Sequence, residues 1–164
     1  MNKKITVRGI GHMFEIFVLP PGIIFIILGF IFKPLFSFRM PYIILLISGI
    51  IFLIAGLALN FISMIKIIPA FKEGKLLTEG AFKFSRNPTY ASLIFFTIPS
   101  LSFLFDTFTL LLCTIIVFII FKICIKREET FLEVKFGDEF RMYKKNTGQL
   151  FPKIFKKKTN TNSL

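Results

Sequence analysis

The sequence contains no tryptophan, one histidine and two cysteines among 164 residues. Cys113 and Cys124 lie in one apolar run, eleven positions apart, which is about 16 Å along a helix. That separation is too large for a disulfide bond between them. A zinc site would also need more ligands than this sequence supplies as cysteine and histidine. We therefore expect neither a disulfide framework nor a bound metal.

Acidic residues are scarce: nine Asp and Glu stand against 21 Lys and Arg, giving a net charge of +12. Such a charge can indicate binding to nucleic acid. Here, however, the basic residues cluster at the ends of apolar runs, where the anionic headgroups of lipids would meet them. We therefore expect membrane lipids as partners and no nucleic acid.

Apolar residues make up 54% of the chain, and the mean hydropathy is +0.75. Both values are far above those of a soluble domain, so we predict an all-α integral membrane protein. About four transmembrane helices are expected, at residues 13–32, 42–65, 90–105 and 108–125. They form a single domain, residues 1–152, which is followed by a basic, disordered tail at 153–164.

Prolines and short turns divide the apolar runs. Pro20 and Pro21 should break or kink the first run, and Pro69 and Gly74 should interrupt regular structure after the second. Asp106 and Thr107 leave room only for a tight turn, and they can cap the helix that follows. The last two runs therefore form an antiparallel hairpin.

Helical periodicity continues beyond the last apolar run, over residues 126–150. Phe131, Leu132, Phe136 and Phe140 are spaced to form an apolar stripe, as in an amphipathic helix. Gly137 interrupts the stripe and can end one helix before another begins. We expect this cytosolic helical tail to fold back against the hairpin.

The positions of Lys and Arg predict the topology. Three precede the first run, five lie between Lys66 and Arg86, and eleven follow from Lys122 onward, which is 19 of the 21. With four spans, these segments share one side of the membrane. Both termini are therefore expected to be cytoplasmic, in a protein of the cell membrane.

Two polar motifs lie at the cytoplasmic ends of the predicted hairpin: Arg86-Asn87-Pro88-x-Tyr90 before it, and Glu128-Glu129 after it. The hairpin should bring them together into one site at the membrane surface. Adjacent residues on a helix point about 100° apart, so we expect only one glutamate to face inward. The alternative is ordinary flanking, with Arg86 at a headgroup and the glutamates as solvated partners of neighbouring basic residues.

The order and spacing of these residues resemble the isoprenylcysteine carboxyl methyltransferase family, whose wider group includes phospholipid N-methyltransferases. The resemblance covers roughly the C-terminal half of the chain. The matching residues are Leu77, Thr78, Gly80, Phe82, Arg86, Asn87, Pro88, Tyr90, Glu128, Glu129, Leu132, Phe136, Gly137, Glu139, Phe140, Tyr143, Phe151 and Pro152.

The resemblance implies a membrane enzyme that transfers a methyl group from S-adenosylmethionine to a lipophilic acceptor, such as a prenylcysteine-like carboxylate or a lipid amine. It implies that Arg86 and Glu129 are the catalytic candidates. The residues implied to bind the cofactor are Leu77, Asn87, Pro88, Tyr90, Glu128, Glu129, Phe140 and Tyr143. Three positions depart from the family's common residues: Asn87 replaces His, Ser92 replaces Gly and Phe140 replaces Tyr.

Two further readings of the sequence remain. In the first, the protein is a small membrane scaffold that binds anionic lipid or a partner through the basic end at Lys156, Lys157 and Lys158. In the second, it is a reductase with a similar membrane architecture and a nicotinamide cofactor, although the sequence has no glycine-rich phosphate-binding loop.

Overall fold

The computed structural model describes residues 8–153, in which all regular secondary structure is helical. This confirms the predicted all-α class; the predicted disordered tail lies outside the described residues except for Lys153. The elements are α1 Arg8–Ile31, α2 Lys33–Phe36, α3 Tyr42–Lys72, the 3-10 helix η1 Gly80–Lys83, α4 Pro88–Ser92, the π-helical turn η2 Leu93–Thr97, α5 Ile98–Leu104, α6 Thr109–Phe136 and α7 Asp138–Asn146.

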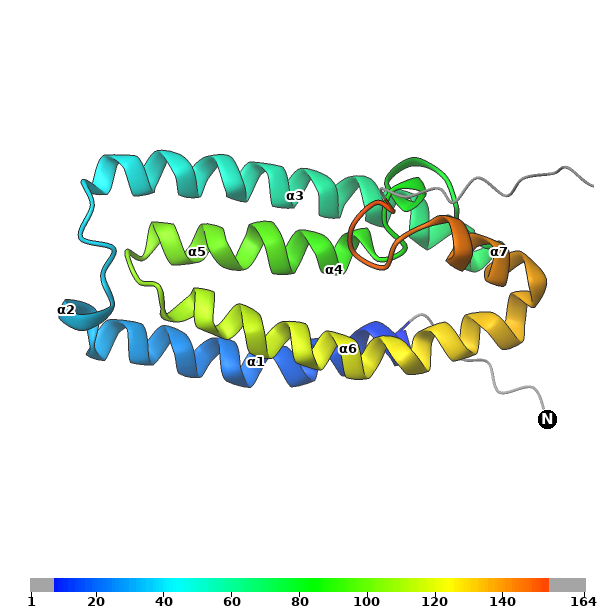
Figure 1. Ribbon diagram of the computed structural model, residues 1–164, viewed down its shortest axis with the longest axis horizontal. Helices are drawn as coiled ribbons and strands as arrows, with labels where there is room; N and C mark the ends of the chain where they lie inside the picture. Colours follow the sequence, from blue (N-terminus) through cyan, green and yellow to red (C-terminus); the bar gives the residue numbers. More distant parts are fainter. Residues whose placement is uncertain (1–7, 154–164) are drawn as a thin grey trace, which may run out of the picture.

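The helices form an elongated bundle (Figure 1). One continuous rod, made of α4, η2 and α5, lies between α3 on one side and α1 with α6 on the other. The rod and α6 run antiparallel, as predicted, and their facing side chains form the core together with Leu150 from the chain after α7. Its buried members are Ala91, Ile94, Ile98, Leu110, Cys113, Val117, Phe121, Ile125 and Leu150.

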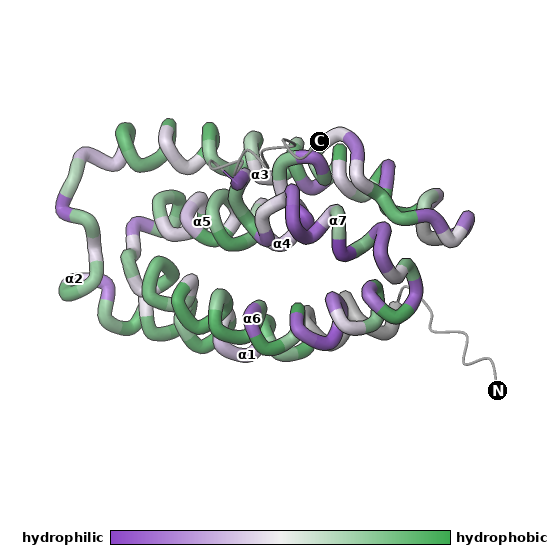
Figure 2. Tube along the Cα trace, turned by 45° about the vertical axis from the view of Figure 1, so that its right-hand side comes forward, coloured by the Kyte–Doolittle hydropathy of each residue, from purple (hydrophilic) through white to green (hydrophobic). Residues whose placement is uncertain are grey.

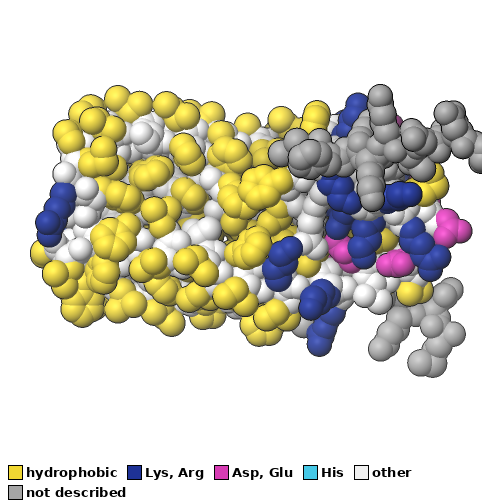
Figure 3. Space-filling view, viewed as in Figure 1, with side chains coloured by type: hydrophobic (Ala, Val, Ile, Leu, Met, Phe, Trp, Pro, Cys, Tyr) yellow, Lys and Arg dark blue, Asp and Glu magenta, His cyan; other side chains and the backbone are white. Residues whose placement is uncertain are grey.

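Two helical stretches are long and apolar enough to cross a membrane: Tyr42–Ala70 within α3, and α6. Ile16–Ile31 and Pro88–Leu104 are shorter apolar helices. Apolar residues follow the length of the bundle, and hydrophilic ones gather toward the end that carries α7 (Figure 2). The surface in Figure 3 repeats this division, with a smaller basic patch at the opposite end.

No proline breaks α1 or α3, although the sequence predicts a break or kink at Pro20 and Pro21 and an interruption at Pro69. α1 continues through Pro20 and Pro21, and α3 continues through Pro69 to Lys72. The proline ring fixes φ near the helical value, and neighbouring helices and side chains let membrane helices tolerate its missing N–H group. α1 therefore ends at Ile31, beside the predicted end at residue 32, whereas α3 continues past the predicted end at residue 65.

Gly74, and not Pro69, ends α3. Its φ of +68° is left-handed, and the N–H of Lys75 donates to the carbonyl of Ala70 at 2.9 Å. The bond joins the residue after the glycine to the carbonyl five residues earlier, as in the Schellman motif that commonly ends helices. The helix therefore continues for about two further turns beyond the predicted boundary at residue 65 before the chain turns.

The hairpin turn differs from the prediction in one detail. Asp106 does not cap α6; its Oδ1 accepts the backbone N–H of Phe38 at 3.1 Å. The N–H of Thr109 is met instead by Thr107 Oγ1 at 3.4 Å. Asp106 therefore ties the hairpin turn to the loop between α2 and α3, an interaction between segments far apart in the sequence.

Gly29 lets α1 approach the hairpin closely. A Cβ atom at this position would lie 2.7 Å from Thr109 Oγ1 and 2.8 Å from Thr107 Oγ1. We expect Gly29→Ala to lower the stability of the detergent-solubilised protein by about 1–3 kcal/mol, as overpacking does. Thermal unfolding would measure this. Gly22→Ala is the control on the same helix, because nothing lies within 4 Å of its added Cβ, and equal losses in both variants would contradict the explanation.

Candidate functional site

The chain after α7 crosses from α6 to the start of α4, and we call residues 147–150 the crossing segment. The N–H of Arg86 donates to the carbonyl of Gly148 at 2.9 Å, within a parallel bridge between Ser85 and Gly148. Ser85 Oγ and Asn87 Nδ2 both donate to the carbonyl of Gln149, at 3.2 and 3.0 Å. The crossing segment is therefore hydrogen-bonded alongside the extended chain that leads into α4.

Arg86 and Glu129 form the centre of the polar cluster. An Arg86 Nη2 hydrogen bond reaches Glu129 Oε1 at 2.6 Å, and the two side chains are only 9% and 12% exposed. Arg86 Nη1 also donates to the carbonyls of Lys144 and Thr147. Glu129 is met in addition by Lys144 Nζ at 3.1 Å and Gln149 Nε2 at 3.1 Å. One carboxylate thus gathers groups from the loop before α4, from α7 and from the crossing segment.

Glu128 has a different environment from its neighbour. Its Oε2 accepts a hydrogen bond from the Tyr90 hydroxyl at 3.2 Å, and the Tyr90 ring lies 5.3 Å from that of Phe121. The structure thus differs from the expectation that only one glutamate would face inward. Both glutamates contact other parts of the protein, and the angle between adjacent helical residues gives them different partners. Glu128 contacts Tyr90 of α4, whereas Glu129 contacts Arg86, α7 and the crossing segment.

Phe140 and Tyr143 fix α7 against η1. Phe140 is 1% exposed, and the Tyr143 hydroxyl donates to the carbonyl of Phe82 at 2.6 Å. Burial raises the pKa of Tyr143, although Arg86 opposes the shift. The phenol therefore remains a hydrogen-bond donor at neutral pH. In this structure both aromatic residues hold the tail in place.

The remaining candidates from the sequence lie on either side of this cluster. Asn87 and Pro88 are buried at the start of α4. Leu77 is half-buried in the loop after α3, where it lines a shallow cavity of about 280 Å³ with Pro69 and Ala70. The structure therefore brings Arg86, Asn87, Tyr90, Glu128 and Glu129 into one contact network and leaves Leu77 beside the end of α3.

Ser92 replaces the glycine common at its position, and its side chain has a structural role. Its hydroxyl donates to the carbonyl of Gly56 at 2.6 Å, and the residue is fully buried. Gly56 has no room for a side chain, because an added Cβ would lie 3.0 Å from Phe96 Cβ. Ser92 therefore joins α4 to α3, and its side chain points to that interface.

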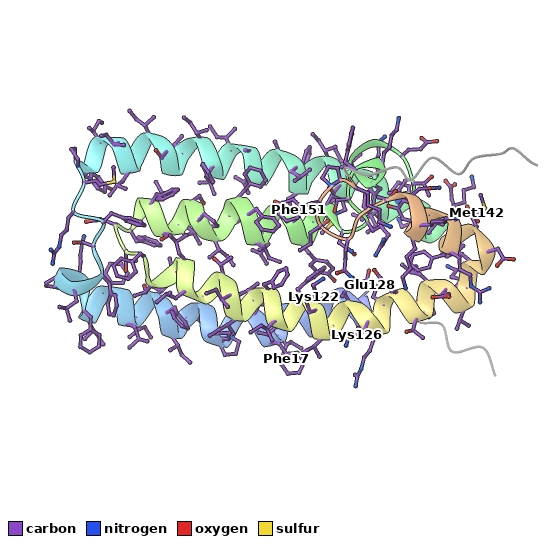
Figure 4. All side chains as sticks on the ribbon, viewed as in Figure 1. Phe17, Lys122, Lys126, Glu128, Met142 and Phe151 are labelled. Carbon is purple, nitrogen blue, oxygen red and sulfur yellow. The ribbon has the colours of Figure 1, made fainter. Side chains whose placement is uncertain are left out.

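Sequence reasoning missed four residues that complete the network: Lys122, Lys144, Thr147 and Gln149. Each makes a hydrogen bond or ion pair with Arg86, Glu129 or another member of the crossing segment. The only signal was the turn-forming stretch after α7, which does not indicate which carboxylate or amide its residues will meet. Figure 4 shows Glu128 and Lys122 between α6 and the chain that carries Phe151, with Lys126 pointing away.

The unused polar groups of the site fit an amino-acid ligand. Arg86 Nε is buried and has no hydrogen-bond partner within residues 8–153. Such a donor suits a ligand carboxylate or a water molecule. Glu128 can accept further hydrogen bonds. A carboxylate accepts several, and the structure gives Glu128 the one from the Tyr90 hydroxyl. A cationic amino group or a pair of hydroxyls could supply the others.

Comparison with known proteins gave one match. The family model for phospholipid methyltransferase matches residues 43–139, which is more than half of the chain. The matched stretch begins in α3, contains the whole hairpin and ends at the start of α7. No curated protein and no solved structure matched this chain.

Proposed function

Because the chain belongs to the phospholipid methyltransferase family, we propose that it transfers a methyl group from S-adenosylmethionine to a lipophilic acceptor at the cytosolic face of the membrane. The observation that carries this proposal is the pairing of Glu128 with Tyr90 beside the closed Arg86–Glu129 cluster. Here the Glu128 carboxylate can accept further hydrogen bonds, and the buried Arg86 Nε–H is an unused donor. The Tyr90 and Phe121 rings lie beside them.

The residues of this chain would bind the cofactor through charge and hydrogen bonds. Glu128 would accept hydrogen bonds from the amino group or the ribose hydroxyls, and the Arg86 Nε–H would donate to the carboxylate. Asn87, Pro88 and Tyr90 would line the pocket, because they form the first turn of α4. Leu77, Phe140 and Tyr143 would support the walls from the loop after α3 and from α7.

S-adenosylmethionine supplies a methyl group on a positively charged sulfur, which an acceptor displaces in line. Such a transfer needs little acid–base assistance, so most of the rate enhancement comes from alignment of the reacting atoms. Arg86 and Glu129 are the catalytic candidates because their ion pair lies next to the Glu128–Tyr90 pair. In the structure Arg86 and Glu129 pair with each other. Their contribution would therefore be to hold the polar side of the site rigid.

The membrane would deliver the acceptor. We propose that α1, α3, the α4–α5 rod and α6 all cross the bilayer, with both termini cytoplasmic. A lipophilic acceptor, whether a prenylcysteine-like carboxylate or a lipid amine, would then reach the site sideways between helices. The polar cofactor would arrive from the cytosol. Dependence on a bilayer or detergent micelle follows from this division.

Calorimetric titration of the detergent-solubilised protein with S-adenosylhomocysteine tests the proposal. We expect a dissociation constant near micromolar, which corresponds to about −8 kcal/mol. In a second assay, we expect the protein to transfer labelled methyl groups from S-adenosylmethionine to extracted membrane lipids. A well-folded protein that binds no S-adenosylhomocysteine would overturn the proposed function. The scaffold reading would then be preferred, and neutralising Lys156, Lys157 and Lys158 would be expected to abolish lipid binding.

A further inference from the structure

Lys122 is a basic residue inside the last apolar run, three positions before its predicted end at residue 125. Its Nζ lies 5.4 Å from the centre of the Phe118 ring and 6.0 Å from that of Phe121. The same atom donates a hydrogen bond to Gln149 Oε1 in the crossing segment. The lysine is therefore held at the side of α6 that borders the candidate site.

Among the side chains that the structure describes, those of residues 16–70 and 72–153, no carboxylate pairs with Lys122. The two glutamates nearest in sequence have other partners: Glu128 meets Tyr90, and Glu129 meets Arg86 and Lys144. A cation within an apolar membrane segment is costly unless an anion or a strong acceptor meets it. A neutral amide oxygen is a weaker partner for an ammonium group than an anion is.

Apolar side chains lie beside this cation, which is exposed. Phe118 and Phe151 are exposed, and the Phe151 ring packs on Phe95 of η2 with 4.5 Å between centroids. Figure 4 places Phe151 across the gap from Lys122. A ligand that reaches Nζ from the bilayer would therefore contact aromatic rings with its apolar part. Such surroundings suit an amphiphile better than a free inorganic ion.

We propose that Lys122 recognises an anionic group, a phosphate or carboxylate, on the methyl acceptor, and so determines acceptor specificity. This inference rests on the proposed function. Lys122 and Glu128 are six residues apart, about 9 Å along α6, with Glu128 nearer the polar end. The acceptor's anionic group would thus lie between its apolar chains and its methyl-accepting atom. Binding would exchange the Gln149 amide oxygen for the anion, while Gln149 keeps its other bond, to Glu129.

Calorimetric titration with short-chain lipids tests this assignment. The probes are dioctanoyl phosphatidic acid, dioctanoylglycerol, which has the same chains and no phosphate, and inorganic phosphate. Wild type is expected to bind phosphatidic acid at least about tenfold more tightly than dioctanoylglycerol, as a charge-assisted hydrogen bond allows. Lys122→Gln should remove that preference, and Lys122→Arg should largely restore it.

Lys126→Gln is the matched control. Lys126 lies one turn further along α6, and its side chain points away from the crossing segment (Figure 4), so the variant removes the same charge outside the proposed site. It is expected to keep the preference for phosphatidic acid. An equal loss in Lys126→Gln would show general attraction of lipid to a basic surface and would overturn the assignment. Inorganic phosphate binding as tightly as the lipid would also overturn it.

Binding of S-adenosylhomocysteine separates this inference from the proposed function. Lys122→Gln is expected to bind S-adenosylhomocysteine as wild type does, since Lys122 contacts the acceptor. If all variants bind S-adenosylhomocysteine and none changes its lipid preference, the specificity assignment fails and the methyltransferase proposal remains. If wild type binds no S-adenosylhomocysteine, the proposed function itself fails.

Discussion

Replacing Glu129 with alanine is expected to release α7 and the crossing segment from the hairpin. The change would leave Arg86 buried without its carboxylate. It would also remove the nearer of the two carboxylates that meet Lys144 and the acceptor of the Gln149 Nε2 hydrogen bond. Removing one member of a buried ion pair costs about 3–5 kcal/mol, because the other charge remains uncompensated. Hydrogen exchange should show loss of protection across 138–150, with a lower midpoint of thermal unfolding.

Glu133→Ala is the control for this prediction. Glu133 lies one turn further along α6 and pairs with Arg141, whose side chain is 63% exposed, and with Lys144 at 3.8 Å, whose side chain is 42% exposed. Exposed ion pairs contribute about 0–1 kcal/mol, so protection across 138–150 should be nearly unchanged. If Glu129→Ala and Glu133→Ala behaved alike, the Arg86–Glu129 pair would not be what holds the tail.

Replacing Glu128 with glutamine is expected to weaken binding of S-adenosylhomocysteine by more than about tenfold, with little change in stability. Glutamine retains the shape of the side chain and an oxygen that can accept the Tyr90 hydrogen bond. It loses the negative charge, and hydrogen bonds to charged groups contribute about 1.5–3 kcal/mol. Calorimetric titration would measure the affinity, and thermal unfolding would show that the fold is intact.

Glu139→Gln is the control for the loss of charge, because Glu139 lies exposed in the first turn of α7. It should bind S-adenosylhomocysteine as wild type does. Unchanged affinity in Glu128→Gln, with a folded protein, would remove Glu128 from the cofactor site. The two predictions separate the glutamates: loss of Glu129 should unfold the tail, whereas loss of the charge on Glu128 should affect the ligand.

The sequence by itself determined the all-helical class, the antiparallel hairpin and the meeting of its two polar motifs. Long apolar runs can satisfy their backbone groups in a membrane only as helices or closed barrels, and the short link at Asp106 forces neighbouring runs to pair. Gly137 was also recognisable as a helix end, and it has a positive φ of 54°. These features depend on local composition and spacing, which the sequence displays directly.

The sequence left open whether Pro20 and Pro21 break or only kink their helix, and it placed an interruption at Pro69 that the structure does not have. It also could not divide the roles of the two glutamates. Pro20, Pro21 and Pro69 all lie inside helices, because neighbouring elements and the helical φ of proline offset its missing donor. Glu128 and Glu129 are identical in type and adjacent in sequence. Only the packing of α4, α7 and the crossing segment around α6 gives one to Tyr90 and the other to Arg86.

Only the tertiary structure assigned partners to Lys122, Ser92 and Gln149. Gln149 meets Lys122 and Glu129, which precede it by 27 and 20 residues, while Ser92 meets Gly56 at a separation of 36. No local pattern encodes these pairs, because each depends on where distant helices come to lie. The sequence therefore determined which polar groups meet at the end of the hairpin, and three-dimensional packing decided which of them pair with one another there.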